Sequence, residues 1–151
     1  SGRAFQVVSG ATVILGRHRS DLEAIQHLIV LYGHVIDDAE WDRLNEIFAP
    51  DGSFQIEGTD IAVSGLDRID EFMRSITHPL AHFSTNVMVD LDEGADVATA
   101  RVKLFAPRAN GTSAIGTYHD VIVRTRRGWR FQQRIVKVAD LHWRSAPLEP
   151  S

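Results

Sequence analysis

The spacing of hydrophobic and polar residues changes along the chain, from a helical period in the first half to a strand period in the second. Between residues 21 and 36 the apolar side chains recur at intervals of three and four, which places them on one face of a helix. Ser20 precedes this stretch and Glu23 follows three residues later, which is the arrangement of a capping box. We therefore predict an amphipathic helix from Asp21 whose apolar face carries Leu22, Ile25, Leu28, Ile29, Tyr32, Val35 and Ile36.

Two shorter helices are predicted downstream. Residues 40–48 carry apolar side chains at helical spacing, and Pro50 ends this second helix. A strand is predicted over 53–57, where polar and apolar residues alternate. A third helix begins after Gly65 and stops before Pro79, because the residue before a proline is driven out of the helical conformation.

The remainder of the chain alternates with a period of two, as strands do. Three strands are predicted over 97–106, 115–124 and 129–138. Before them, residues 82–91 form a strand with one face of Phe83, Val87, Val89 and Leu91 and another of His82, Ser84, Asn86 and Met88. Helices followed by a run of antiparallel strands indicate the α+β class. We expect three N-terminal helices packed on a strongly curved, mostly antiparallel sheet, which together form a cone around a cavity.

The chain of 151 residues has the length of one domain, and it shows no internal repeat, low-complexity tract or linker. We place this domain over residues 20–142. Residues 1–19 are expected to form an N-terminal extension, within which 11–15 are interpreted as a weak edge strand. Residues 143–151 are expected to form a C-terminal tail.

Composition and charge remove several classes of function. Acidic residues outnumber basic ones by 20 to 16, whereas nucleic-acid binders usually show a basic excess, so we expect no nucleic-acid partner. No apolar run approaches the length of a membrane span, and we expect a cytoplasmic protein without a membrane partner. Cysteine is absent, which excludes thiol nucleophiles and cysteine-ligated metals. Because metal-ligand spacings and glycine-rich phosphate loops are also missing from the sequence, we expect neither a metal nor a cofactor.

Proton transfer is the chemistry that the remaining residues permit. The chain has seven histidines, whose ordinary pKa near 6.5 suits proton exchange at neutral pH. His27 and His34 fall on the polar face of the first helix, where we expect them to be solvated. His78 and His142 have no evident companions in the sequence. The only lysines, Lys103 and Lys137, lie in contexts that do not suggest a Schiff base.

Several short stretches have a characteristic order and spacing, namely 24–28 with Tyr32, Asp37 and Trp41, then 48–54, Gly65, 82–86, 116–120, 128–131 and Arg134. Together they resemble the SnoaL-like branch of the nuclear-transport-factor-like α+β barrel superfamily. The resemblance covers about residues 20–142 and implies that fold. Within the superfamily, the nearest functional likeness is to cofactor-free lyases, namely scytalone dehydratase, bile-acid dehydratase and hexachlorocyclohexane dehydrochlorinase.

The resemblance also implies a catalytic pair. Those lyases use a pocket histidine paired with an aspartate from the end of the first helix, and the matching positions are His82 and Asp37. The expected function is therefore a cofactor-independent, dehydratase-like lyase that acts in an apolar pocket on a hydrophobic cyclic or polyketide-like small molecule. His82 would be the base, and Asp37 would orient it and stabilise the imidazolium.

Four further residues are candidates for substrate contact. Tyr32 matches a pocket tyrosine of the bile-acid enzyme, and His119 lies in the strand where scytalone dehydratase places a pocket histidine. Asn86 is a candidate beside His119. Arg134 is expected in a surface or rim charge network, from which it could reach an anionic group of the substrate.

Alternatives remain open. Asp37 could instead cap the second helix, since Glu40 follows three residues later, or Asp38 could supply that cap. The same pocket would serve an isomerase or polyketide cyclase, and the superfamily also includes ligand-binding proteins and dioxygenase small subunits that are not catalytic. If the face of His82 lines a pocket, the apolar face opposite must be covered. We therefore expect a homodimer or homotrimer through the convex face of the sheet.

Overall fold

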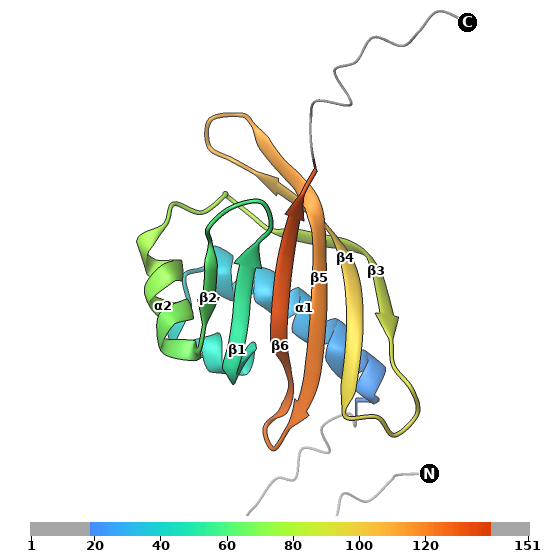
Figure 1. Cartoon of the computed structure of the whole chain (residues 1–151). Helices are drawn as coiled ribbons and strands as arrows, with labels where there is room; N and C mark the ends of the chain where they lie inside the picture. The colour runs from blue at the N-terminus through green and yellow to red at the C-terminus, as the bar shows by residue number, and fades with distance from the viewer. Residues whose placement is uncertain (1–18, 140–151) are drawn as a thin grey trace, which may run out of the picture.

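The structure, a computed structural model, describes residues 19–139 (Figure 1). The strand predicted over 11–15, His142 and the C-terminal tail lie outside the described residues. Within the described part of the chain, no helix is long and apolar enough to cross a membrane. The elements in chain order are α1 (Asp21–Asp37), the 3-10 helix η1 (Trp41–Glu46), β1 (Phe48–Ile56), β2 (Ala62–Ser64), α2 (Leu66–Ser75), β3 (Phe83–Asp90), β4 (Val97–Pro107), β5 (Ser113–Thr125) and β6 (Gly128–Val138).

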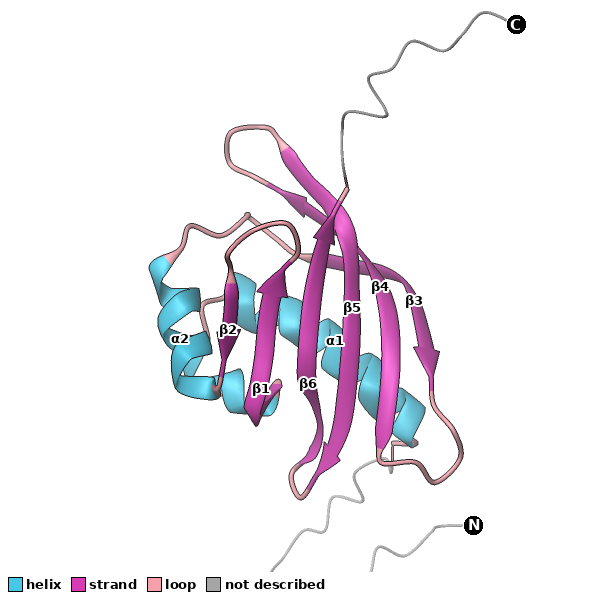
Figure 2. Cartoon of the chain, viewed as in Figure 1, coloured by secondary structure: helices cyan, strands magenta, loops and turns pink. Residues whose placement is uncertain are grey.

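The strands form one six-stranded sheet in the order β2-β1-β6-β5-β4-β3 (Figure 2). β1 and β6 run parallel, and the other neighbours pair antiparallel. α1 crosses one face of the sheet, while α2 lies beside the β1–β2 edge (Figure 1). This arrangement confirms the predicted α+β class. The sheet is curved but open, so it is a cone rather than a closed barrel.

α1 follows from the pattern that predicts it. Ser20 Oγ accepts a hydrogen bond from the Glu23 backbone N–H at 3.2 Å, and Glu23 Oε2 accepts from the Ser20 backbone N–H at 2.9 Å, which completes the capping box. The apolar face of α1 packs on the sheet, where burial of each large side chain is worth about 1.5–3 kcal/mol. The residues of α1 in this core are Ile25, Leu28, Ile29, Tyr32, Val35 and Ile36.

The second predicted helix is shorter than expected, and the first strand is longer. Residues 40–48 contain only the single 3-10 segment η1, and β1 already begins at Phe48. Pro50 therefore lies inside a strand rather than after a helix. The β1–β6 register shifts between Phe48 and Ser53. Pro50 lies within this irregular part of the strand, where its missing N–H does not interrupt a regular series of strand hydrogen bonds.

An irregularity in β3 changes which side chains share a face. The β3–β4 register shifts between Thr85 and Met88, and Asn86 has a positive φ of 49°. Beyond this bulge Val89 pairs with Ala100, which is buried, so Val89 joins the face of Ser84. The single alternation predicted over residues 82–91 is therefore wrong beyond Asn86.

The two faces of the sheet differ in what covers them. We call the face against α1 the inner face and the opposite one the outer face. The outer face carries Phe83 and Phe105, whose rings stack with centroids 6.1 Å apart and which are 54% and 42% exposed. Met88, which lies further along β3 opposite Arg101, is also exposed. The homodimer or homotrimer expected through this convex face remains a prediction.

Candidate active site

Asp37 and His82 meet where α1 ends and β3 is about to begin. Asp37 Oδ1 lies 2.6 Å from His82 Nδ1, and Asp37 Oδ2 accepts a hydrogen bond from the His82 backbone N–H at 3.0 Å. The His82 side chain is only 9% exposed and that of Asp37 21%. Neither Asp37 nor Asp38 caps η1, whose N-cap residue is Glu40 without a side-chain hydrogen bond. The carboxylate of Asp37 therefore holds the histidine by its ring and its backbone together.

A glycine makes this approach possible. Gly33 lies one helical turn before Asp37 on α1 and is buried. A Cβ atom at Gly33 would lie 2.8 Å from the carbonyl oxygen of His82, closer than real Cβ contacts come. Because Gly33 has no side chain, the chain that leads into β3 can lie directly against α1, and His82 then falls within reach of Asp37.

The hydrogen bond between them defines the state of the histidine. A carboxylate can only accept, so Nδ1 of His82 carries the hydrogen and Nε2 is left with its lone pair. Burial, aided by the charges of His78 and Arg134, lowers the pKa of His82 below its ordinary value despite the opposing effect of Asp37. His82 is therefore neutral at pH 7, with Nε2 able to accept a proton.

Arg134 and Asp120 form a second buried pair on the inner face. Nε and Nη2 of Arg134 each donate to one carboxylate oxygen of Asp120 at 2.8 Å, and both side chains are fully buried. The guanidinium also lies 4.3 Å from the ring centroid of Tyr32, 3.8 Å from that of Tyr118 and 4.1 Å from that of Phe131. The prediction of a surface or rim network for Arg134 is wrong, because cross-strand pairing brings Asp120 directly opposite it.

Two polar groups of this interior lack a hydrogen-bond partner among the described residues. They are Nη1 of Arg134 and the hydroxyl of Ser84, and both are buried. Ser84 lies on the inner face, since its β4 partner Leu104 is buried. Because a buried polar group without a partner costs free energy, such groups indicate where a bound molecule could supply hydrogen bonds.

Tyr32 connects the two pairs. Its ring meets that of His82 edge to face with centroids 6.1 Å apart, while Arg134 lies over its face. Tyr32 is 2% exposed, and burial raises its pKa to about 12. The hydroxyl therefore keeps its hydrogen at neutral pH and can act as a donor.

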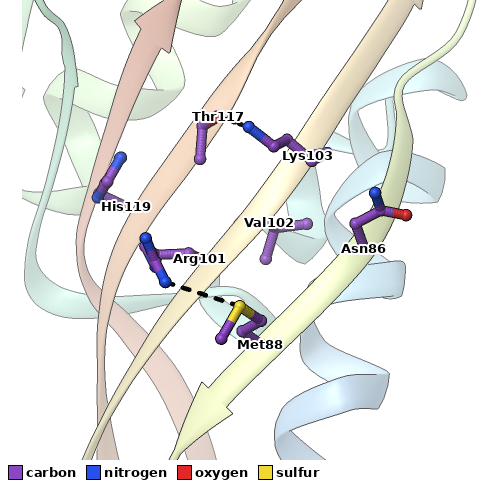
Figure 3. A pocket seen from close by; sticks show the side chains of 7 residues that line it. All are labelled: Asn86, Met88, Arg101, Val102, Lys103, Thr117 and His119. Atoms are coloured by element: carbon purple, nitrogen blue, oxygen red, sulfur yellow. Dashed lines mark hydrogen bonds between the residues drawn. The ribbon is translucent and has the colours of Figure 1, made fainter.

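His119 and Asn86 lie elsewhere. Both line a cavity of about 230 Å³ on the outer face, together with Arg101 and Lys103 (Figure 3). His119 and Asn86 therefore line the same cavity, and His82 does not line it. The alternation along β5 could not show to which face of the sheet His119 points, since apolar side chains such as Val121 occur on the outer face of β5 as well as on the inner one.

His78 is a neighbour of the pair that the sequence did not indicate. Its ring centroid lies 6.2 Å from that of His82 and 5.4 Å from that of Trp41. Its Nε2 lies 2.7 Å from the carbonyl oxygen of Met73, so this nitrogen carries the hydrogen. His27 and His34 are exposed on α1, as predicted. Among residues 19–139, no group of three or more histidine, aspartate or glutamate side chains could hold a metal ion.

Comparison with known proteins places this architecture in a family. The model of the SnoaL-like domain matches residues 17–135 of the chain. The chain belongs to the SnoaL-like domain family. An uncharacterized protein of Mycobacterium tuberculosis (strain ATCC 25618 / H37Rv) is 30% identical to this SnoaL-like domain over 129 residues, which cover 77% of this chain and 84% of the relative.

Solved structures show the same fold. An NTF2-like protein with a cystatin-like fold from Novosphingobium aromaticivorans superposes with a TM-score of 0.67 at 27% identity, covering 80% of this chain and 82% of its own. A provisionally named scytalone dehydratase from the same organism also has a TM-score of 0.67, at 19% identity, and covers 80% and 85%. At that identity, the second likeness concerns the fold of the SnoaL-like domain alone.

Sequence reasoning missed Asp120 and Tyr118, which complete the surroundings of Arg134. The available signal was local. Asp120 stands between Tyr118 and Ile122 at every second position of a predicted strand, which makes it a charged residue on an otherwise apolar face. A buried carboxylate at such a place requires a cation opposite, and Arg134 on the next strand could have been proposed as that cation.

Proposed function

We propose that this SnoaL-like domain is a cofactor-independent lyase that removes water from a hydrophobic cyclic or polyketide-like molecule, with His82 as the general base. The observation that carries the proposal is the short hydrogen bond from His82 Nδ1 to Asp37 in a nearly buried setting. In this arrangement His82 is neutral, because its pKa is lowered, and its Nε2 keeps a lone pair that can accept a proton. A general base requires both properties.

In the proposed reaction, His82 Nε2 takes the proton from the carbon next to a substrate carbonyl. Asp37 stabilises the imidazolium that forms, because its carboxylate already accepts from Nδ1. The electrons of the broken C–H bond form the new double bond through an enolate as the C–O bond of the β-hydroxyl breaks. The imidazolium returns its proton to the departing hydroxyl, which leaves as water, so His82 ends the cycle neutral.

Arg134 and Tyr32 are proposed to stabilise the enolate oxygen. Asp120 compensates the charge of Arg134, yet Nη1 keeps a free N–H. A neutral carbonyl that gains negative charge only in the transition state suits such a donor better than a permanent anion does. The proposed substrate is therefore a β-hydroxy carbonyl compound without a carboxylate at this position.

The family supports the class of function and not the substrate. SnoaL-like and NTF2-like proteins include dehydratases and isomerases, and one structural neighbour has been provisionally named a scytalone dehydratase. Fold alone does not establish a reaction, so the proposal depends on the geometry of His82, Asp37 and Arg134.

The test is elimination from a panel of β-hydroxy ring ketones, followed by the ultraviolet absorbance of the conjugated product and by its mass. We expect the wild-type chain to form a product lighter by one water. His82→Ala should lower kcat by about 100-fold to 10,000-fold, the usual contribution of a positioned base, with unchanged far-ultraviolet circular dichroism. His27→Ala, which removes an exposed histidine of α1, is the matched control and should keep full activity.

Three results would contradict the proposal. The first is full activity of His82→Ala. The second is a product with the mass of the substrate, because this would indicate isomerisation or cyclisation without loss of water. The third is equal loss in His27→Ala, which would show that the assay reports general damage to α1 rather than the base.

A further inference from the structure

A second cleft lies at the end of the sheet where β1 and β6 begin. Its volume is about 540 Å³, and it lies between η1, the start of β1, the start of α2 and the β5–β6 hairpin. Figure 1 shows the hairpin and the beginning of β1 at the same end of the sheet. We call it the hairpin cleft. Neither His82 nor Asp37 lines it.

Three arginines converge on the hairpin cleft. Arg126 and Arg127 belong to the turn between β5 and β6, and Arg130 follows on β6. Arg130 is held in place, because its Nε donates to the carbonyl of Asn45 at 2.8 Å and its Nη1 to the carbonyl of Trp129 at 2.9 Å. Burial lowers the pKa of Arg130, and the positive charge of Arg127 lowers it further.

None of these arginines has a carboxylate partner within 4.0 Å among residues 19–139. Arg124 on the same hairpin behaves differently, since it pairs with Asp21 at 2.7 Å and with Asp96 at 2.9 Å. Glu46 lies near enough for its charge to raise the pKa of Arg130, but it forms no ion pair with it. The cleft therefore collects three positive charges without a direct carboxylate partner, in a chain whose formal net charge is −4. Like charges that share a cleft repel one another, and an anion bound between them would relieve that repulsion.

The turn that carries two of the arginines is well defined. Thr125 Oγ1 donates to the carbonyl of Gly128 at 2.7 Å and accepts from the backbone N–H of Arg127 at 3.2 Å. Gly128 has a positive φ of 111°, which favours glycine at this position. The backbone at Arg126 and Arg127 is therefore fixed before any ligand arrives, which lowers the entropic cost of binding.

The rest of the lining is largely apolar. Phe48, Pro50 and Leu66 contribute to the same cleft. A ligand that suits it has an anionic group for the arginines and an apolar body for these side chains. A carboxylate brings one negative charge, whereas a phosphate monoester brings about 1.5 to 2 at pH 7 and offers three oxygens to the planar guanidinium forks.

We propose that the hairpin cleft binds a small molecule that carries a phosphate monoester on an apolar body. This site is separate from the proposed lyase site, and neither depends on the other. Arg130 and the pair Arg126 and Arg127 hold the phosphate, while Pro50 and Leu66 contact the apolar part.

The experiment titrates phenyl phosphate, inorganic phosphate and benzoate into the ¹⁵N-labelled chain and follows backbone amide shifts. Phenyl phosphate should bind more tightly than either other probe, with the largest shifts at the hairpin and around Phe48 and Leu66. Arg130→Gln should weaken binding by about tenfold, the value of one charged hydrogen bond, and the Arg126→Gln/Arg127→Gln double variant should do the same. Arg108→Gln, at the exposed β4–β5 turn, removes equal charge and should leave the affinity within twofold.

Several outcomes would overturn the proposal. Benzoate binding as tightly as phenyl phosphate would contradict the preference for phosphate. Equal affinity of the wild-type chain and the variant with all three arginines changed to glutamine would show that the arginines do not hold the phosphate. Amide shifts confined to other parts of the chain would show that the ligand binds elsewhere. Arg126 and Arg127 are exposed, so the double variant is expected to fold, and its thermal midpoint would verify this.

Discussion

The inner and outer faces of the sheet carry the same residue types in different surroundings. On the inner face, Arg134 is fully buried, bound at two points by Asp120 and enclosed by aromatic rings. On the outer face, Arg101 is exposed and donates only a long hydrogen bond of 3.7 Å to the sulfur of Met88. The two arginines lie on the strands that flank β5, where Arg101 pairs with His119 and Arg134 with the next residue, Asp120.

The two histidines differ in the same way. His82 is enclosed and has a carboxylate on one ring nitrogen. His119 is half-buried on the outer face, where the other charged residues of its cavity are Arg101 and Lys103. Burial and a fixed partner, rather than residue type, therefore distinguish the proposed proton-transfer site from the outer face.

The largest expected difference between the faces is in stability. Asp120→Asn leaves the buried guanidinium of Arg134 without a compensating charge and should lower the free energy of unfolding by about 3–5 kcal/mol, measured by urea denaturation. Such a loss is a large part of the total of about 5–15 kcal/mol that holds a domain together.

A double variant sharpens this prediction. Asp120→Leu with Arg134→Met removes both charges at once, and it should be more stable than Asp120→Asn, because no buried charge is left unpaired. The matching single variants are Asp120→Leu and Arg134→Met. If their losses add up to the loss in the double variant, the pair is not coupled, contrary to its 2.8 Å geometry.

The smallest expected effects lie on the outer face. Arg101→Gln and His119→Gln each remove a side chain that has no carboxylate partner among the described residues, so the free energy of unfolding should change by less than about 0.5 kcal/mol. Turnover on any substrate of the wild-type chain should stay within twofold. A larger loss of turnover in His119→Gln would show that the outer face takes part in the reaction, contrary to the proposed difference between the two faces.

Helices and strands were predictable because their apolar residues repeat locally. The capping box at Ser20, the stripe of α1 and the long strands β4, β5 and β6 all follow from spacing within a short window. The bulge at Asn86 was not predictable. One residue in the left-handed region exchanges the two faces of β3 beyond it, and the residue pattern gives no sign of this.

The candidate site could not be predicted in the same way, because it depends on contacts between segments that are far apart in the sequence. Asp37 and His82 are 45 residues apart, and nothing in their local sequences links them, so their pairing was expected from the family resemblance alone. Asp120 and Arg134 are 14 residues apart and become partners only through the β5–β6 register. The face to which His119 points could not be assigned, because both sides of β5 carry apolar residues.

The central claim, that His82 is a neutral base held by Asp37, can be measured without a substrate. Long-range ¹H–¹⁵N correlation spectra of the histidine side chains, recorded across pH, report the protonated nitrogen and the pKa of each ring. We predict that His82 carries its hydrogen on Nδ1 and titrates below 6.5, so it remains neutral at pH 7 and gains charge only as the pH falls through that lower value. Asp37→Asn should abolish this preference for Nδ1. A hydrogen on Nε2, or a pKa of 6.5 or above in the wild-type chain, would contradict the account.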